Sequence, residues 1–261
     1  MNTLERTMIE VLKDLRDNHQ VVEVKAEFEA EASRMNELMR LKEIAEKVGL
    51  GLVVKIGGCE AISDMFEAQH LGVTGLIAPM IESSYALSKF LTAIKKYFPK
   101  DLRREIHFGV NVETEIAYNN FDRMLKLEMI RLIDTITVGR IDLSASLGLG
   151  RDDINCDKVY GIVKDIYKKA KRKKLRTTLG GGIAVEAIPF IKKLIDKKLL
   201  DRFETRKIVF NTPKKFDRIE EGIIKANKFE LLWLENKKKH YGGIYREDMD
   251  RIKMLKRRIA F

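Results

Sequence analysis

The sequence has few of the residues that mark secreted, disulfide-bonded or membrane-spanning proteins. Only two of its 261 residues are cysteine, Cys59 and Cys156, and two cysteines cannot form a disulfide framework. No apolar run approaches the roughly 20 residues needed to cross a bilayer. Residues 1–20 lack the continuous apolar core and the cleavage site of a secretion signal. We therefore expect a cytoplasmic protein with no membrane partner.

Recognition motifs for nucleotides and nucleic acids are also absent. The run Gly180-Gly181-Gly182 lacks the spacing of a dinucleotide-binding fingerprint, and there is no zinc-finger spacing or aromatic-basic RNA motif. The formal net charge is nevertheless +11. Lys and Arg cluster between apolar residues at helical spacing, which is typical of the solvated faces of amphipathic helices. A basic field that attracts anionic metabolites explains this charge, and we do not expect nucleic acid as a partner.

Short apolar runs alternate with helical segments, which predicts an α/β fold with a mainly parallel sheet. Seven strands can be assigned, over residues 21–28, 52–56, 75–80, 106–112, 135–139, 176–179 and 207–210. A closed (β/α)8 TIM-type barrel is the leading architecture, with a first strand that is atypical or missing. An open doubly wound sheet is the alternative.

We predict three parts in the chain: an N-terminal helix in residues 1–20, the barrel in residues 21–212 and a C-terminal helical arm in residues 213–261. In the arm, apolar periodicity predicts a helix over residues 216–241, a break at Gly242-Gly243 and a final helix over residues 247–258. We expect the arm to join copies of the chain in a homo-oligomer. An intramolecular cover for the barrel is the alternative.

Two acidic residues close neighbouring apolar runs. Glu113 follows residues 106–112, and Asp142 follows residues 135–139. Ligand sites of α/β folds lie at the carboxyl ends of the strands, and paired carboxylates suit a hard divalent cation such as Mg²⁺ or Mn²⁺. Glu113 and Asp142 are therefore candidate metal ligands, although each acid could instead cap the helix that follows its strand.

Four segments appear in an order that resembles the hydroxy-oxo-acid aldolase and citrate lyase β-subunit superfamily. They are Ala26-Glu27-Phe28-Glu29, residues 71–82, Asn111-Val112-Glu113-Thr114 and residues 139–148. The resemblance covers roughly residues 21–210 and implies a metal-dependent (β/α)8 lyase that acts on pyruvate, an oxo-acid or a related acyl unit. It also implies that Glu113 and Asp142 hold the metal, and a divalent cation would stabilise the enolate that forms when a carbon–carbon bond breaks beside a carbonyl.

The sequence departs from the family pattern at three positions. Lys55 stands where an arginine is common, so the substrate carboxylate would meet a point charge in place of a bidentate fork. Ala30 replaces the histidine that follows the acid matching Glu29, and proton transfer would then fall to Glu27, Glu29 or metal-bound water. Arg140 stands where the aldolases carry proline. It could contact an anionic substrate or pair with a structural acid.

We accordingly expect Lys55, Glu29 and Arg140 to be catalytic. Lys55, Arg140, Ser144, Gly180 and Gly181 are the candidates for substrate binding. Backbone N–H groups of a glycine loop near the last strands can bind phosphate, which would allow a phosphorylated or CoA-linked substrate, but the glycines could equally serve a tight turn. The predicted function is an aldolase-like carbon–carbon lyase for an oxo-acid or hydroxy-acid. The alternatives are a CoA-thioester lyase of the citrate-lyase branch and an inactive barrel that serves as a binding protein.

Overall fold

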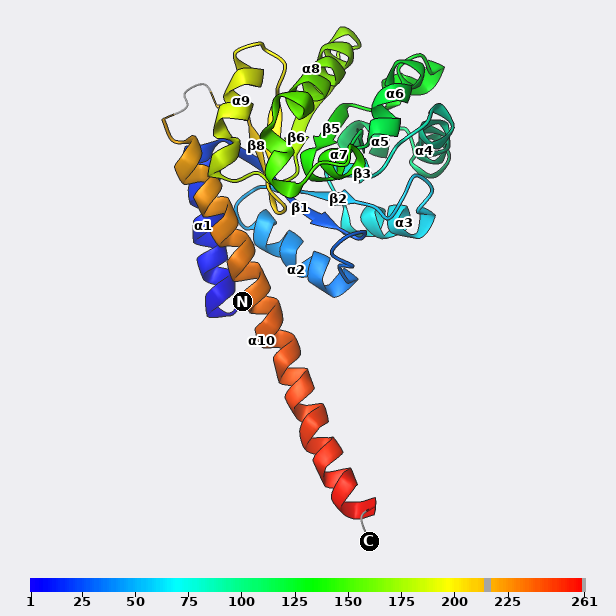
Figure 1. The fold of residues 1–261 in the computed structure, drawn as a ribbon. Helices are drawn as coiled ribbons and strands as arrows, with labels where there is room; N and C mark the ends of the chain where they lie inside the picture. The colour runs from blue at the N-terminus through cyan, green and yellow to red at the C-terminus, as the bar shows by residue number, and fades with distance from the viewer. Residues whose placement is uncertain (214–216, 260–261) are drawn as a thin grey trace.

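The computed structural model describes residues 1–213 and 217–259 and contains a closed eight-stranded barrel ringed by helices (Figure 1). The predicted TIM-type barrel is therefore confirmed, and the open sheet is excluded. The strands are β1 (Val21–Glu27), β2 (Gly51–Lys55), β3 (Gly75–Ala78), β4 (His107–Asn111), β5 (Thr135–Gly139), β6 (Arg176–Gly180), β7 (Arg202–Glu204) and β8 (Ile208–Asn211).

The helices lie outside the barrel, where their apolar faces pack on the outward side chains of the strands. They are α1 (Thr3–His19), α2 (Met35–Glu46), α3 (Ile62–Leu71), α4 (Ser84–Tyr97), α5 (Leu102–Glu105), α6 (Glu115–Met124), α7 (Arg140–Ser146), α8 (Asp157–Arg172), α9 (Ile188–Ile195) and α10 (Ile219–Ile259). Three short 3₁₀ segments, Glu128–Leu132, Arg151–Asn155 and Val185–Ala187, complete the connections.

The sheet is mainly parallel, as predicted, and β8 is the strand that runs in the opposite direction. β7 has only three residues and was missed in the sequence, and β8 pairs antiparallel with both β7 and β1. A turn of residues 205–207 joins β7 to β8, because antiparallel neighbours need no crossover helix. The first strand is present and pairs in parallel with β2, so the atypical strand is the last one. The turn consequently lies at the same rim as the carboxyl ends of β1 to β7.

The inside of the barrel is lined by charged side chains. Lys25 Nζ of β1 lies 2.5 Å from Glu204 Oε1 of β7 and 3.3 Å from Glu27 Oε1. All three side chains are buried, while Val24 and Ala26 of β1 face the surrounding core. Burial alone would lower the pKa of Lys25, but the charges of Glu204 and Glu27 outweigh it and raise that pKa above its ordinary value.

A second ion-paired group fills the opposite end of the barrel, where the strands begin. Glu23 Oε2 lies 2.7 Å from Arg202 Nη1, and Glu23 Oε1 lies 3.4 Å from His107 Nδ1. The imidazole of His107 occupies the space where a side chain on Gly75 would stand. Burial lowers the pKa of His107 and favours its neutral form. His107 is thus a residue of the barrel floor, as its position at the start of β4 requires.

The C-terminal arm is a single helix, α10, and the predicted break at Gly242-Gly243 is wrong. Two glycines cost a helix about 1 kcal/mol each, and the stretch contains no proline to remove a hydrogen bond or clash with the preceding turn. The expected helix start at Phe216 lies outside the described residues. The first part of α10 packs along α1 and buries Ile223, Ala226 and Phe229, and the rest projects away from the barrel (Figure 1).

No helix in the part of the chain that the structure describes is long and apolar enough to span a membrane.

The ion pairs of Lys25 generate a prediction about stability. Lys25→Met should lower the free energy of unfolding by about 3–5 kcal/mol, because it leaves Glu204 buried without its cation and leaves Glu27 with Lys55 alone. Urea unfolding at pH 7 measures this loss. In the double variant Lys25→Met/Glu204→Gln one stranded charge is removed, and most of the stability should return. A loss below about 1 kcal/mol in the single variant would contradict the role given to Lys25.

Candidate active site

Glu113 and Asp142 lie on neighbouring connections at the carboxyl rim of the barrel. Glu113 follows β4 by two residues, and Asp142 lies in the first turn of α7, which begins directly after β5. Because β4 and β5 pair in parallel, the two acids emerge at the same rim. Glu113 is buried, and its carboxylate accepts hydrogen bonds from the Met80 backbone N–H at 3.3 Å and from Asn111 Nδ2 at 3.2 Å.

Helix capping does not account for Glu113. The helix after β4 is capped by the next residue, Thr114, whose side chain accepts a hydrogen bond from the Ala117 backbone N–H at 3.1 Å. The N-cap of α7 is Gly139, which has no side chain to contribute. Glu113 instead turns into the barrel mouth, where Gly139 makes room for it: a Cβ added to Gly139 would overlap Glu113 Oε2.

The electrostatics of the two acids fit a divalent cation. Burial raises the pKa of Glu113 to about 7; Lys55 opposes this rise and the charge of Asp142 adds to it. Burial also raises the pKa of Asp142. Carboxylates held in this way are under-compensated, and a hard cation would supply the missing charge. Asn111 Oδ1 is a further buried oxygen, with no hydrogen-bond partner in the described part of the chain.

Lys55 and Glu29 meet at the same mouth. Lys55, at the end of β2, places Nζ 2.7 Å from Glu29 Oε2 and 3.4 Å from Glu27 Oε1. Burial acts to lower the pKa of Lys55, but the neighbouring carboxylates raise it above its ordinary value, so the ammonium is charged. Its charge also acts on Glu113 and Asp142. Lys55 thus acts on four carboxylates, of which Glu27 also pairs with Lys25, and this leaves the mouth acidic.

We expected Arg140 to contact the substrate, but its side chain is not open to the barrel mouth. Its side chain is fully buried, and it donates hydrogen bonds to the carbonyl oxygens of Gly181 and Gly182 at 2.9 and 3.0 Å and to Asn155. Its guanidinium also lies 5.0 Å from the ring centroid of Phe190. Burial lowers the pKa of Arg140 to about 10. Its donors are directed at the glycine loop and not at a carboxylate.

The glycine loop itself depends on close backbone approach. Gly181 has φ +74°, and a Cβ there would overlap the backbone nitrogens of Arg140 and Ile141. The tight-turn explanation therefore accounts for Gly181 without a bound phosphate. Gly180 ends β6 beside Glu204. Ser144, on α7, is buried, and its Oγ has no hydrogen-bond partner among the residues that the structure describes.

Two residues of the mouth escaped the sequence analysis. Gly139 had no recognised role, because the space it leaves for Glu113 appears only when β5 lies beside the β4 connection. Arg206 directly precedes the strand predicted over residues 207–210 and had no recognised role, because the three-residue strand β7 before it was missed. The only available sign was the local sequence Glu204-Thr205-Arg206-Lys207 before an apolar run, which is consistent with a hairpin but weak on its own.

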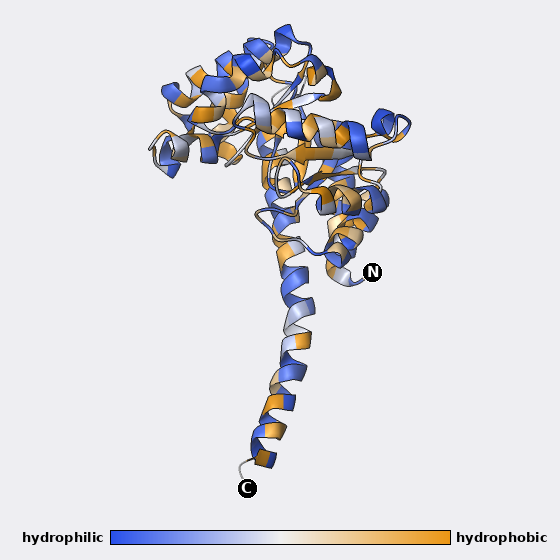
Figure 2. Cartoon of the chain, turned by 90° about the vertical axis from the view of Figure 1, so that its right-hand side faces the viewer, coloured by the Kyte–Doolittle hydropathy of each residue, from blue (hydrophilic) through white to orange (hydrophobic). Residues whose placement is uncertain are grey.

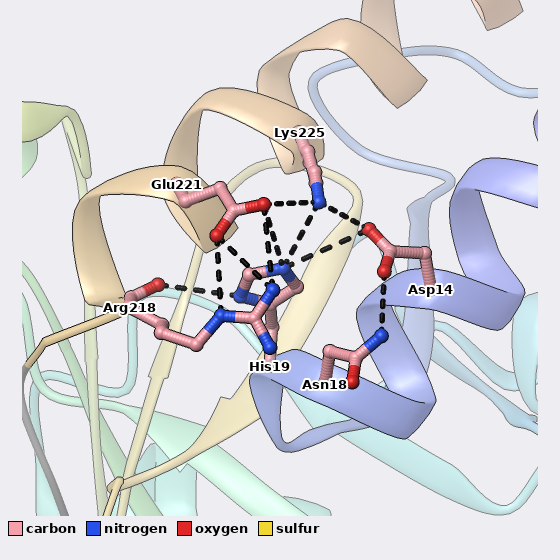
Figure 3. Close-up of polar contacts among 6 residues, drawn as sticks. All are labelled: Asp14, Asn18, His19, Arg218, Glu221 and Lys225. Atoms are coloured by element: carbon pink, nitrogen blue, oxygen red, sulfur yellow. Dashed lines mark hydrogen bonds and ion pairs between the residues drawn. The ribbon is translucent and has the colours of Figure 1, made fainter.

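A second cluster of potential metal ligands lies between α1 and α10, away from the rim. The ligand atoms of Asp14, His19 and Glu221 all lie within 4.8 Å of one another, the only such group of three among the described residues. Figure 3 shows Lys225 pointing into this group. Its Nζ lies 2.5 Å from Glu221 Oε1 and 3.2 Å from His19 Nε2 and also bonds Asp14. The ammonium supplies the cation, so the cluster joins the two helices.

Comparison with known proteins gives one family. The model of the HpcH/HpaI aldolase/citrate lyase family matches residues 17–180, more than half of the chain. No curated protein matches the chain in sequence. The matched residues include Glu113, Asp142, Lys55 and Glu29, but stop before β7 and α10.

Solved structures share the fold at low sequence identity. An HpcH/HpaI aldolase from Desulfitobacterium hafniense DCB-2 superposes with a TM-score of 0.60 at 15% identity, over 76% of this chain and 81% of that one. The citrate synthase SbnG gives 0.62 at 18% identity, over 78% and 82%. A family protein from Burkholderia cenocepacia J2315 gives 0.61 at 13% identity, over 93% and 90%.

The room that Gly139 leaves for Glu113 can be tested without removing a metal ligand. Gly139→Ala should weaken Mn²⁺ binding about tenfold or more, because the added methyl displaces the Glu113 carboxylate while the backbone at φ −85° accepts alanine. Isothermal calorimetry of the metal-free protein measures the change. Gly161→Ala, on α8 with open space around it, is the matched control and should bind like wild type. If Gly139→Ala and Gly161→Ala bound Mn²⁺ with equal affinity, the assignment of Glu113 as a metal ligand would be contradicted.

Proposed function

Because the chain belongs to the HpcH/HpaI aldolase/citrate lyase family, we propose that it is a metal-dependent carbon–carbon lyase for an oxo-acid or hydroxy-acid. The family and its barrel indicate an aldolase-like lyase acting on a small acid. The observation that carries the finer proposal is the pair Glu113 and Asp142, two under-compensated carboxylates on neighbouring connections of the rim.

Glu113 and Asp142 would hold Mg²⁺ or Mn²⁺, in keeping with the general dependence of the family on a divalent metal. When bound, the cation acts as a Lewis acid that stabilises negative charge on the substrate oxygen. Asn111 supports the site by donating to Glu113. Gly139 keeps open the space that the Glu113 carboxylate occupies.

Lys55 and Glu29 are the proposed catalytic pair on the protein side. Lys55 would hold the substrate carboxylate by its charge, at the end of β2 where it already pairs with Glu29. Glu29 is half-buried, and the 2.7 Å contact with Lys55 fixes its carboxylate at the mouth, where it can take or return a proton. This assignment replaces the histidine of the family pattern. Glu27 is more deeply buried and already balances two lysines.

Arg140 enters the proposal as a positioning residue for the glycine loop. Its hydrogen bonds to Gly181 and Gly182 fix the loop beside α7, and Gly180 and Gly181 would contact substrate through the backbone alone. The Ser144 hydroxyl remains a candidate for a substrate hydrogen bond. A phosphorylated or CoA-linked substrate would use this loop. Cys59 and Cys156 are unpaired, which supports the proposed cytoplasmic location.

Metal binding and enolisation test the function directly. We expect wild type loaded with Mg²⁺ or Mn²⁺ to catalyse exchange of the C3 hydrogens of pyruvate for deuterium in deuterated water. NMR measures the loss of the C3 proton signal. Glu113→Gln and Asp142→Asn should each lower metal affinity at least tenfold and abolish exchange, because each removes a charged ligand. Lys55→Met should slow exchange while metal still binds. A wild type that binds neither metal would instead favour the inactive barrel.

The projecting part of α10 supports a proposal about assembly. Tyr245, Ile252 and Leu255 are 65%, 41% and 42% exposed, and their spacing of seven and three residues places them along one side of the helix. Figure 2 shows hydrophobic positions, in orange, among hydrophilic ones along the part of α10 that extends clear of the barrel. We therefore propose that α10 pairs with a second copy of the chain.

Sedimentation velocity at several concentrations tests this assembly. Wild type should sediment as a dimer or larger species, and Ile252→Glu/Leu255→Glu should shift it to a monomer, because four charged groups would then face one another across the paired helices. Lys253→Glu/Arg257→Glu places two acids at other positions of the same segment and serves as the charge control. A wild type that is monomeric at every concentration would contradict the proposal.

A further inference from the structure

Arg206 stands at the centre of the turn between β7 and β8. This turn reaches the catalytic rim only because β8 runs antiparallel to its neighbours. A parallel eighth strand would have placed the same residues at the floor of the barrel. The side chain of Arg206 is exposed, and no hydrogen bond or ion pair joins it to another residue in the described part of the chain.

The turn is anchored on both sides of Arg206. Thr205 and Lys207 are buried, and the Thr205 backbone N–H donates to the Ile208 carbonyl at 2.9 Å. Lys207 Nζ lies 2.5 Å from Glu31 Oε2, and its carbonyl accepts from the Lys25 backbone N–H at 2.8 Å. The hairpin is therefore tied to β1 and to the loop after it, and the backbone that carries Arg206 is held in place.

The positive charge of Arg206 reaches the site. Burial raises the pKa of Glu27, and the charges of Lys25 and Lys55 lower it; the charge of Arg206 acts in the same direction as the two lysines. Glu230 of α10 feels the same charge but forms no ion pair with Arg206 among the contacts of the described residues. Arg206 therefore lies at the rim because its turn does, and its guanidinium is not committed to a protein carboxylate in the described part of the chain.

The other cations of the site are already engaged. Lys25 pairs with Glu204 and Glu27, Lys55 pairs with Glu27 and Glu29, and the donors of Arg140 go to carbonyl and amide oxygens. A single carboxylate beside the reacting carbonyl would be served by the metal and Lys55. A second anionic group, further along the substrate, would be repelled by the carboxylates that line the mouth. It therefore needs a cation that is not already paired with a protein carboxylate.

We infer that Arg206 binds a second anionic group, a carboxylate or a phosphate, at the far end of the substrate from the reacting carbonyl. Arg206 is then a specificity residue that selects doubly anionic oxo-acids. The inference rests on the proposed function, because the oxo-acid end is placed at the metal ligands. A guanidinium can bind either kind of oxyanion through two parallel hydrogen bonds.

Matched ligands test the inference in the Mn²⁺-loaded full chain. Calorimetry would compare 2-oxoglutarate with 2-oxopentanoate, which has the same carbon chain without the second carboxylate, and with 2-oxo-4-phosphonobutanoate. We expect wild type to bind at least one dianion about tenfold more tightly than 2-oxopentanoate, the low end of what a hydrogen bond to a charged group contributes. The stronger dianion identifies carboxylate or phosphate as the preferred group.

Variants of Arg206 separate this effect from general charge. Arg206→Gln should bind the dianion and 2-oxopentanoate with about equal affinity, and Arg206→Lys should restore part of the preference for the dianion. Arg172→Gln, an exposed arginine on α8 away from the rim, should keep the wild-type preference. Equal binding of the dianions and 2-oxopentanoate by wild type, or an unchanged preference in Arg206→Gln, would overturn the inference alone. No binding of any oxo-acid would overturn the proposed function and the inference with it.

Discussion

The structure depends on charge compensation inside the barrel. Lys25 is buried between Glu204 of β7 and Glu27 of β1, and Glu27 is shared with Lys55 at the mouth. A buried carboxylate without a partner would be protonated or would destabilise the fold. Each ion pair therefore constrains the relative positions of the strands that carry its two residues. These ion pairs are continuous from Glu204 in the barrel interior to Lys55 and Glu29, the proposed catalytic residues at the mouth.

The charge balance changes along the barrel. In the interior, lysine and arginine neutralise the acids of β1 and β7. At the mouth, Glu27, Glu29, Glu113 and Asp142 share mainly Lys55, and burial raises the pKa of both Glu113 and Asp142. The excess of carboxylate at one end is costly for a protein that holds no cation there. That cost is consistent with a site built to receive a divalent metal and an anionic ligand together.

The antiparallel last strand links three features of the molecule. It closes the barrel without a final crossover helix, because β7 and β8 need only the turn of residues 205–207. It raises that turn, with Arg206, to the catalytic rim. It also ends at the barrel floor, beside His19, so that α10 can begin there and run along α1. One change of strand direction thus supplies a rim cation and sets the path of the projecting helix.

The sequence by itself determined the alternation of strands and helices and the position of Glu113 and Asp142 past two strand ends. These features depend on local periods of two and 3.6 residues and on which residue follows a strand. Only the tertiary structure decided the direction of β8, the burial of Arg140 and the space beside Gly139. Pairing direction and charge compensation depend on residues far apart in the chain, such as Lys25 and Glu204, which are 179 positions apart. No local pattern records which of them will meet.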